Sequence, residues 1–250
     1  MTLLEQRDGH YHFVPNGVGS PYCRGVVAAP GYEVVHATLR RSIPWREGFA
    51  FVDRYLASIG RPGAALCAVE LRAPATYRPD RWTGAGTFNQ EYVDLLKSRG
   101  LFVDGENPVA RTNVVPRLNP PAEQVLFAFS YTVPTPTGDT SPTFVAAGSG
   151  EDPSVYPKET STEALRAKTR NVMAEMRSRL SALGARWEDV TAVDLYTVHD
   201  FGAFIREEVL EQIGPAARQG IHWYDTRPPI DDREVEVDLR GVRQEVRVEA

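Results

Sequence analysis

The sequence predicts a protein of mixed helices and strands, built as a tandem duplication of one unit. Helix-like and strand-like patterns follow one another in the same order in both halves. Short stretches of the first half also recur in the second half at a regular offset, which is typical of an internal repeat. The stretch "PTPTGDTSP", from Pro134 to Pro142, lies between the halves and has the composition of a linker.

Four helices are expected, because apolar residues repeat at spacings of three and four in four segments. Each segment has polar or proline residues where a helix begins and a glycine where it ends. The helices are expected at 49–59 (begun by Ser42 and Pro44, ended by Gly60), 88–96 (Thr87 and Gln90, Gly100), 165–183 (Thr160 and Glu163, Gly184) and 201–209 (Asp200, Gly214).

Strands are expected between and after these helices. "CAVEL" at 67–71 and "TAVDL" at 191–195 each follow a first helix, and two strands, 110–115 and 125–133, follow the second helix of the first half. In the second half, a short strand after Arg218, a Pro-containing turn and a strand in "REVEVD" repeat that ending.

The recurring stretches indicate the duplication directly. "YLASIG" and "RLSALG" at the ends of the first helices are 124 residues apart, as are "CAVEL" and "TAVDL". The offset falls to 113 for the second helices and to 107 for Arg111 and Arg218, because the first half carries additional Gly- and Pro-rich loops.

The composition excludes several classes of protein. The chain has 250 residues, a net charge of −5 and a pI of about 5.6, whereas nucleic-acid binding requires a basic face. No run of apolar residues is long enough to span a membrane, and the N-terminus lacks the pattern of a secretion signal. Two cysteines, Cys23 and Cys67, are expected to be reduced thiols. We therefore expect a cytoplasmic protein.

The motif "PVARTNV" before the last strands of the first half, with "PAARQGIHW" as its looser counterpart, resembles the RidA (YjgF) family of enamine and imine deaminases. Asn89 and Tyr92 match the Asn-x-x-Tyr of that family's second helix. The resemblance implies an α+β fold of two tandem RidA-like (chorismate-mutase-like) domains, 1–135 and 136–250, each a β-sheet packed against two helices. It also implies a homo-oligomer, a trimer in most members, with ligand sites in clefts between subunits or between the two halves.

Substrate-binding residues follow from the same resemblance. Arg111 matches the arginine that holds the substrate carboxylate in the family, and a guanidinium is suited to this because it binds a carboxylate through two parallel hydrogen bonds. Arg218 is its counterpart, and a muconate-type substrate has two carboxylates. Asn89 is expected to hydrogen-bond the ligand, and Asn113 and Gly220 to offer main-chain groups. The structural alternatives are an interface ion pair for the arginines, a role in the first helical turn for Asn89 and a strand bulge for Gly220.

Catalytic residues are expected in the second half. Glu236 occupies the place of a glutamate that positions water in the family, while the first half has Phe127 or a neighbour there. His222 follows Arg218 by four residues, so on a strand both would point to one face, and a histidine transfers protons near neutral pH. Glu236 as a solvated strand residue and His222 packed beside Trp223 are the alternatives. The sequence has no metal, dinucleotide or P-loop motif, so no cofactor and no metal are expected.

The N-terminal stretch "SPYCRGVVAAPGYEVVHATL" and the long double form resemble the branch of 2-aminomuconate and 2-amino-5-chloromuconate deaminases. The predicted function is a cofactor-free hydrolytic deaminase of an enamine or imine acid, with a product of aromatic ring cleavage as the expected substrate. Two alternatives remain open at this point: a noncatalytic module that binds a carboxylate metabolite, and a tautomerase or isomerase of the same pathway.

Overall fold

A computed structural model describes residues 2–81, 84–135 and 141–250. The strands are β1 (Leu4–Gln6), β2 (Tyr11–Pro15), β3 (Cys23–Ala28), β4 (Tyr32–Pro44), β5 (Leu66–Arg72), β6 (Ala110–Pro116), β7 (Val125–Pro134), β8 (Phe144–Gly150), β9 (Ala192–Tyr196), β10 (His222–Tyr224), β11 (Thr226–Arg227), β12 (Glu236–Gly241) and β13 (Gln244–Val248). The helices are α1 (Trp45–Ser58), α2 (Phe88–Ser98), α3 (Thr162–Ala182) and α4 (Glu211–Ile213), with short helical segments η1 (Gly63–Ala65), η2 (Pro79–Arg81), η3 (Trp187–Asp189), η4 (Arg206–Leu210) and η5 (Gly214–Gln219). None of the helices in the described ranges combines the length and the apolar composition of a membrane span.

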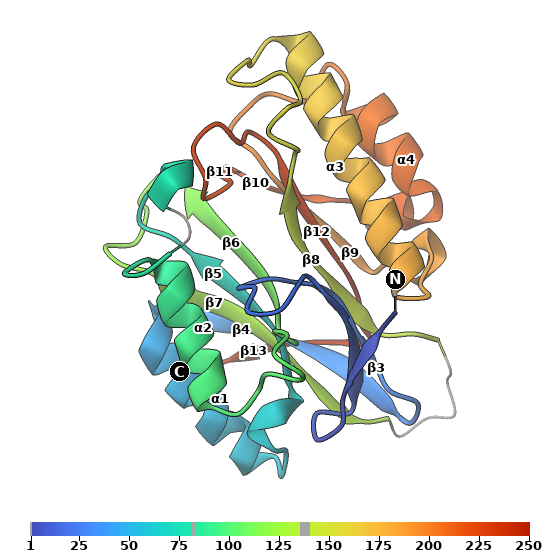
Figure 1. The fold of residues 1–250 in the computed structure, drawn as a ribbon. Helices are drawn as coiled ribbons and strands as arrows, with labels where there is room; N and C mark the ends of the chain where they lie inside the picture. The colour runs from blue at the N-terminus through green and yellow to red at the C-terminus, as the bar shows by residue number, and fades with distance from the viewer. Residues whose placement is uncertain (1, 82–83, 136–140) are drawn as a thin grey trace.

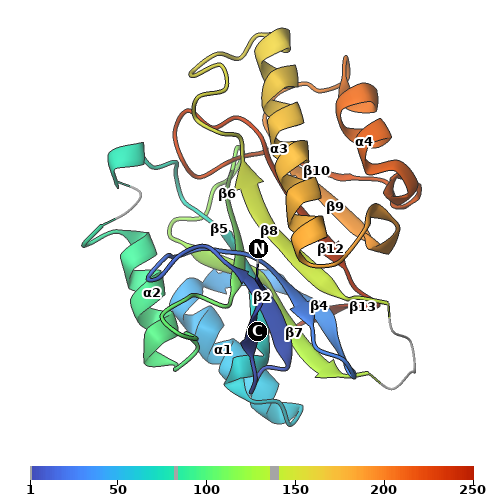
Figure 2. The same ribbon diagram turned by 45° about the vertical axis from the view of Figure 1, so that its right-hand side comes forward.

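The strands form two mixed sheets that lie face to face, with helices on both outer sides (Figure 1). One sheet has the order β1-β2-β3-β8-β12-β9-β10, and the other has the order β11-β6-β5-β7-β4-β13. Helices α1 and α2 cover the six-stranded sheet, whereas α3 and α4 cover the seven-stranded sheet. The turned view in Figure 2 shows the same four layers, with strands of the two sheets in the middle.

Strand pairing across the two halves corrects the expected tandem arrangement. β1, β2 and β3, from the first half, belong to the same sheet as β8, β9, β10 and β12, and Gly25 of β3 pairs with Ala146 of β8. In return, β11 and β13, from the second half, extend the six-stranded sheet beside β6 and β4. The chain is therefore one α+β domain, and the prediction of two tandem RidA-like domains was wrong. Part of the predicted linker, residues 136–140, lies outside the described residues.

The three long helices agree with the sequence pattern, with small differences at their ends. In α2 the side chain of Thr87 accepts a hydrogen bond from the backbone of Gln90, as predicted. In α3 the N-cap is Ser161, which accepts from Ala164, and not the expected Thr160. Apolar faces of these helices pack on the sheets and form two separate cores.

The fourth expected helix differs more. Instead of a regular helix over 201–209, the chain makes a turn in which Asp200 accepts from the backbone of Gly202. A wider helical segment, η4, then leads through the single turn of α4 into η5. Gly214 has a φ of 51°, which a residue with a side chain rarely adopts, so the helix ends there as expected.

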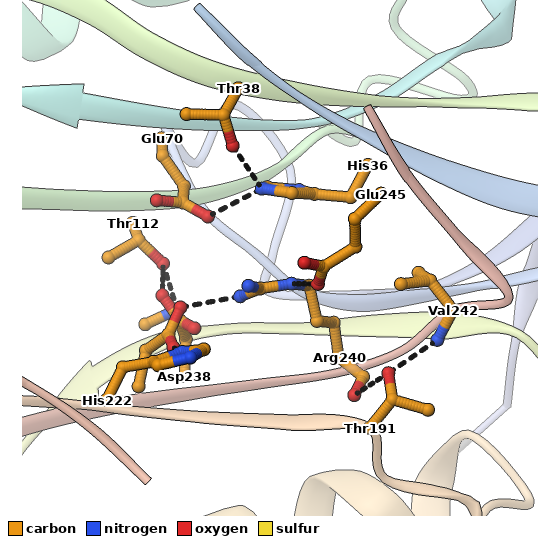
Figure 3. Close-up of polar contacts among 12 residues, drawn as sticks. His36, Thr38, Glu70, Thr112, Thr191, His222, Asp238, Arg240, Val242 and Glu245 are labelled. Carbon is orange, nitrogen blue, oxygen red and sulfur yellow. Dashed lines mark hydrogen bonds and ion pairs between the residues drawn. The ribbon is translucent and has the colours of Figure 1, made fainter. Parts of the chain in front are cut away.

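A layer of polar side chains lies between the sheets, next to a small apolar cluster (Figure 3). Nη1 of Arg240 donates to Oδ2 of Asp194 at 2.5 Å, and its Nε donates to Glu245 at 2.8 Å. Burial would lower the pKa of Arg240, but the nearby Asp194 and Glu70 carboxylates outweigh it and raise that pKa. This guanidinium therefore neutralises acidic groups that the two sheets bury together.

Replacement of Arg240 by methionine is expected to lower the free energy of unfolding by about 3–5 kcal/mol, because the buried Asp194 carboxylate would lose its cation. Urea denaturation followed by circular dichroism measures this. Arg78→Met is the control, since the Arg78 side chain is 73% exposed in its ion pair with Asp80 and should contribute about 0–1 kcal/mol. An equal decrease in the free energy of unfolding of the two variants would show that Arg240 does not neutralise a buried carboxylate.

Candidate active site

A cavity of about 250 Å³ opens between the two sheets near the N-terminal end of β12. Its walls come from β3, β6, β8, β12, α3 and the loop before β12, so both halves of the chain contribute. The lining residues are Asn16, Tyr22, Cys23, Arg24, Arg111, Asn113, Gly148, Ser149, Gly150, Glu151, Arg179, Pro228, Pro229, Ile230, Arg233 and Glu236. The volume suits a small metabolite.

Arg111 lies on β6 and is 6% exposed. Its Nη2 donates to Oδ1 of Asn89 at 2.8 Å, so the helix residue that the motif singled out orients the guanidinium. Aromatic rings surround the same group, with the ring centres of Tyr92, Tyr22 and Phe88 at 4.6, 5.3 and 5.6 Å. These rings hold a cation in place while it faces the cavity.

Asn113 lies two residues further along β6, on the same face as Arg111. Its Oδ1 accepts a hydrogen bond from Nε2 of Gln124 at 2.7 Å. Its Nδ2 is buried and has no hydrogen-bond partner among the described residues, while the residue lines the cavity. The side-chain amide thus has an unused donor next to the cavity, whereas the sequence pointed to main-chain groups at this position.

Glu236 is the first residue of β12 and is 6% exposed. Burial raises the pKa of its carboxyl to about 8, although the positive charges of Arg111 and Arg179 lower it in part. At neutral pH the group is therefore a carboxylic acid that can give a proton to a bound molecule. The alternative interpretation, a solvated strand residue, does not hold.

Gly148 of β8 makes room for this carboxyl. A Cβ at Gly148 would overlap Oε1 of Glu236 and would lie 2.9 Å from Oγ1 of Thr112. The backbone nitrogen of Gly148 donates to that same hydroxyl at 3.1 Å, which links β8 to β6 at this point. Glycine thus permits the close approach of the Glu236 carboxyl to the strand and is not needed for an unusual backbone angle.

Gly148→Ala is therefore expected to displace the Glu236 carboxyl and to lower kcat by about 10²-fold, as small misplacements of reacting groups do. Steady-state kinetics measure the effect. Gly150→Ala serves as the stability control, because its Cβ would meet its nearest atom at 3.5 Å and should leave Tm unchanged. Full activity in Gly148→Ala would show that the carboxyl position is not critical.

Several charged residues of the cavity were not identified from the sequence. Arg24 on β3 and Arg179 on α3 both bond to Oε1 of Glu175, at 2.6 and 2.8 Å. Glu151 accepts from the backbone of Glu234 and Val235 at 2.9 and 3.1 Å, which fixes the chain just before Glu236. Of these contacts, the sequence indicates only the ion pair of Glu175 and Arg179, because these two residues have the i, i+4 spacing of a helical ion pair.

Buried Lys168 completes the support of Glu236. Its Nζ lies 3.3 Å from Oε1 of Glu151, and both side chains are 1% exposed. The lysine neutralises Glu151, so this carboxylate does not cancel the positive charge of the arginines in the cavity.

Three candidates from the second half lie outside the cavity, which corrects the expectation that they face the ligand with Arg111. Arg218 and Gly220 are exposed, in and just after η5, because this segment forms a helical turn on the surface and not the start of a strand. His222 starts the edge strand β10, and its Nδ1 bonds to Oδ1 of Asp194 at 2.7 Å, in the polar layer of Figure 3. That hydrogen bond raises the pKa of His222.

Three carboxylates between the sheets have the spacing of a metal site. One oxygen each of Glu70, Asp194 and Asp238 lies within 4.8 Å of the others. These groups already have partners, however: Asp238 accepts from Thr112 and Tyr196, Asp194 bonds to Arg240, and Glu70 lies 3.4 Å from Arg72. The protein's own donors and cations thus satisfy the oxygens that a cation would need.

Comparison with known proteins adds family information to this geometry. A family model described as 2-aminomuconate deaminase CnbZ matches residues 3–246. A 2-amino-5-chloromuconate deaminase of Comamonas testosteroni is 38% identical over 246 residues, which cover 95% of this chain and 95% of that protein. Among solved structures, a crystal structure of chorismatase gives a TM-score of 0.43 at 13% identity, over 91% of this chain and 80% of that chain. The family match includes every residue of the cavity.

Proposed function

The chain belongs to the 2-aminomuconate deaminase family, and on that premise we propose that its cavity hydrolyses the enamine of a 2-aminomuconate-type acid and releases ammonia. Such a substrate is a dienedioate that carries an amino group on the carbon next to one carboxylate. The observation that carries the proposal is a buried carboxylic acid, Glu236, which shares a metabolite-sized cavity with the oriented guanidinium of Arg111.

Arg111 binds the carboxylate beside the amino-bearing carbon. Its guanidinium offers parallel donors to the two carboxylate oxygens, and Asn89 and the surrounding rings hold it before the ligand arrives. The amide nitrogen of Asn113 donates to the substrate or to the attacking water. A fixed carboxylate places the reacting carbon next to Glu236, and this orientation contributes much of the rate.

Glu236 acts first as an acid and then as a base. Its carboxyl gives a proton to a carbon of the enamine, which turns the C–N bond into an iminium and leaves Glu236 as a carboxylate. A water molecule adds to the iminium carbon and gives a proton back to Glu236. The carboxyl then protonates the amino group, the C–N bond breaks, and the hydroxyl proton returns to Glu236 as the 2-oxo acid and ammonia form.

The test is incubation of the purified protein with freshly generated 2-aminomuconate, followed by assays of ammonia and of the organic product. Release of one ammonia per 2-oxo acid at a rate far above the protein-free control supports the proposal. An isomerised product that keeps its nitrogen would identify a tautomerase. Binding without any turnover would identify a noncatalytic module, and either of these results would overturn the proposal.

A further inference from the structure

A second positively charged group lies in the cavity besides Arg111. Arg24 from β3 and Arg179 from α3 share the single carboxylate of Glu175, with Nη2 of Arg24 at 2.6 Å and Nε of Arg179 at 2.8 Å from the same oxygen. Two guanidinium groups and one carboxylate leave one net positive charge. Both arginines line the cavity, whereas Glu175 does not.

Arg179 is held rigidly in this group. Its side chain is 11% exposed, its Nε is bonded to Glu175, and its Nη1 donates to the backbone oxygen of Ala147 at 2.8 Å. Its Nη2 forms no hydrogen bond with the described residues. A largely buried, pre-oriented guanidinium with remaining donors is suited to bind a carboxylate.

The charges around the cavity favour an anion with two negative groups. Among the described residues, Arg24, Arg111, Arg179 and Arg233 line it, together with two carboxyl groups. Of these two, Glu151 is neutralised by Lys168 at 3.3 Å, and burial keeps Glu236 protonated at neutral pH by raising its pKa to about 8. The positive charges of Arg111 and Arg179 both lower the pKa of Glu236, and all three residues line the same cavity.

We propose that Arg179, with Arg24 beside it, binds the second carboxylate of the substrate while Arg111 binds the first. The assignment rests on the proposed function for the identity of the substrate, but the binding site itself is tested without turnover. It replaces Arg218, which is exposed and outside the cavity, as the partner of Arg111. The pair makes the cavity selective for dicarboxylates, because a ligand with one carboxylate leaves a buried guanidinium without its anion.

Muconate and sorbate are both unreactive six-carbon dienes, but muconate has two carboxylates and sorbate has one. A comparison of their binding therefore tests the second carboxylate site. Isothermal titration calorimetry on the wild type is expected to show muconate binding at least 10²-fold more tightly than sorbate, as a buried charge pair contributes. Arg179→Met is expected to remove most of this preference. Arg24→Met, which keeps the Arg179–Glu175 bond, is expected to reduce it by a smaller factor.

Equal affinity for the two dienes in the wild type, or an unchanged preference in Arg179→Met, would overturn the proposal. Circular dichroism and Tm establish that each variant is folded. If Arg179→Met does not fold, Arg24→Met decides the question, because an unchanged preference for muconate in Arg24→Met also contradicts the proposal. Failure of the deaminase proposal would appear separately, as muconate selectivity without ammonia release from 2-aminomuconate.

Discussion

Glu236→Gln is expected to reduce kcat for ammonia release by about 10²–10⁴-fold, the usual contribution of a general acid–base residue. Glutamine has the size of the protonated carboxyl but gives no proton to the enamine carbon and accepts none from water. The loss should lie in kcat, with a small change in KM, because Arg111 and the rest of the cavity still bind the substrate. A variant with wild-type kcat would exclude Glu236 from the proton transfers.

The pH dependence of the wild type follows from the same group. Since the pKa of Glu236 is raised to about 8 by burial, kcat/KM is expected to fall as the pH rises through about 8, where the free enzyme loses the acid. The native state keeps this proton between pH 4.5 and about 8 while the unfolded state has released it, so this group makes stability fall over that window. As the pH increases through this window, the Tm of Glu236→Gln should therefore rise relative to that of the wild type. If the two proteins give parallel curves of Tm against pH, the raised pKa is contradicted.

Arg111→Lys is expected to reduce kcat/KM by about 10²-fold or more, although it keeps the positive charge. An ammonium cannot form the two parallel bonds to a carboxylate, and it loses the planar contact with the rings of Tyr92 and Tyr22. Weaker binding of the carboxylate also misplaces the reacting carbon, so both kcat and KM should change. Steady-state kinetics with 2-aminomuconate measure both.

Arg218→Lys is the matched control for this prediction. Arg218 occupies the corresponding place in the sequence repeat, yet it is exposed on η5 and absent from the cavity lining. The control should have wild-type kinetics. A loss in Arg218→Lys equal to that in Arg111→Lys would show that the cavity is not the site of the reaction.

Local patterns predicted the local structure well. The spacing of apolar residues identified α1, α2 and α3, and Thr87 was identified as a cap because capping depends on residues three apart. The exchange of strands between the halves could not be read in this way. β13 pairs with β4 some two hundred residues earlier in the chain, and no local periodicity records which distant edge a strand will join.

The candidate site, too, could be predicted only where local motifs mark its residues. The family motifs singled out Arg111 and Asn89, and in the structure Nη2 of Arg111 lies 2.8 Å from Oδ1 of Asn89. The repeat also suggested Arg218 and His222, which sit on a surface turn and an edge strand because the second half does not repeat the helix of the first. Arg24 and Arg179 lie in stretches that indicated the repeat and the family resemblance, but no pattern marked either of them as a binding residue. The packing of α3 on β3 and β8 brings them to the cavity.

A crystal structure of the protein with bound muconate would show directly whether Arg111 and Glu236 form one site. We expect the diene inside the cavity, with one carboxylate paired in parallel with the Arg111 guanidinium and the adjacent carbons within reach of the Glu236 carboxyl. Muconate bound elsewhere, without contact to Arg111 or Glu236, would show that this cavity is not the substrate site.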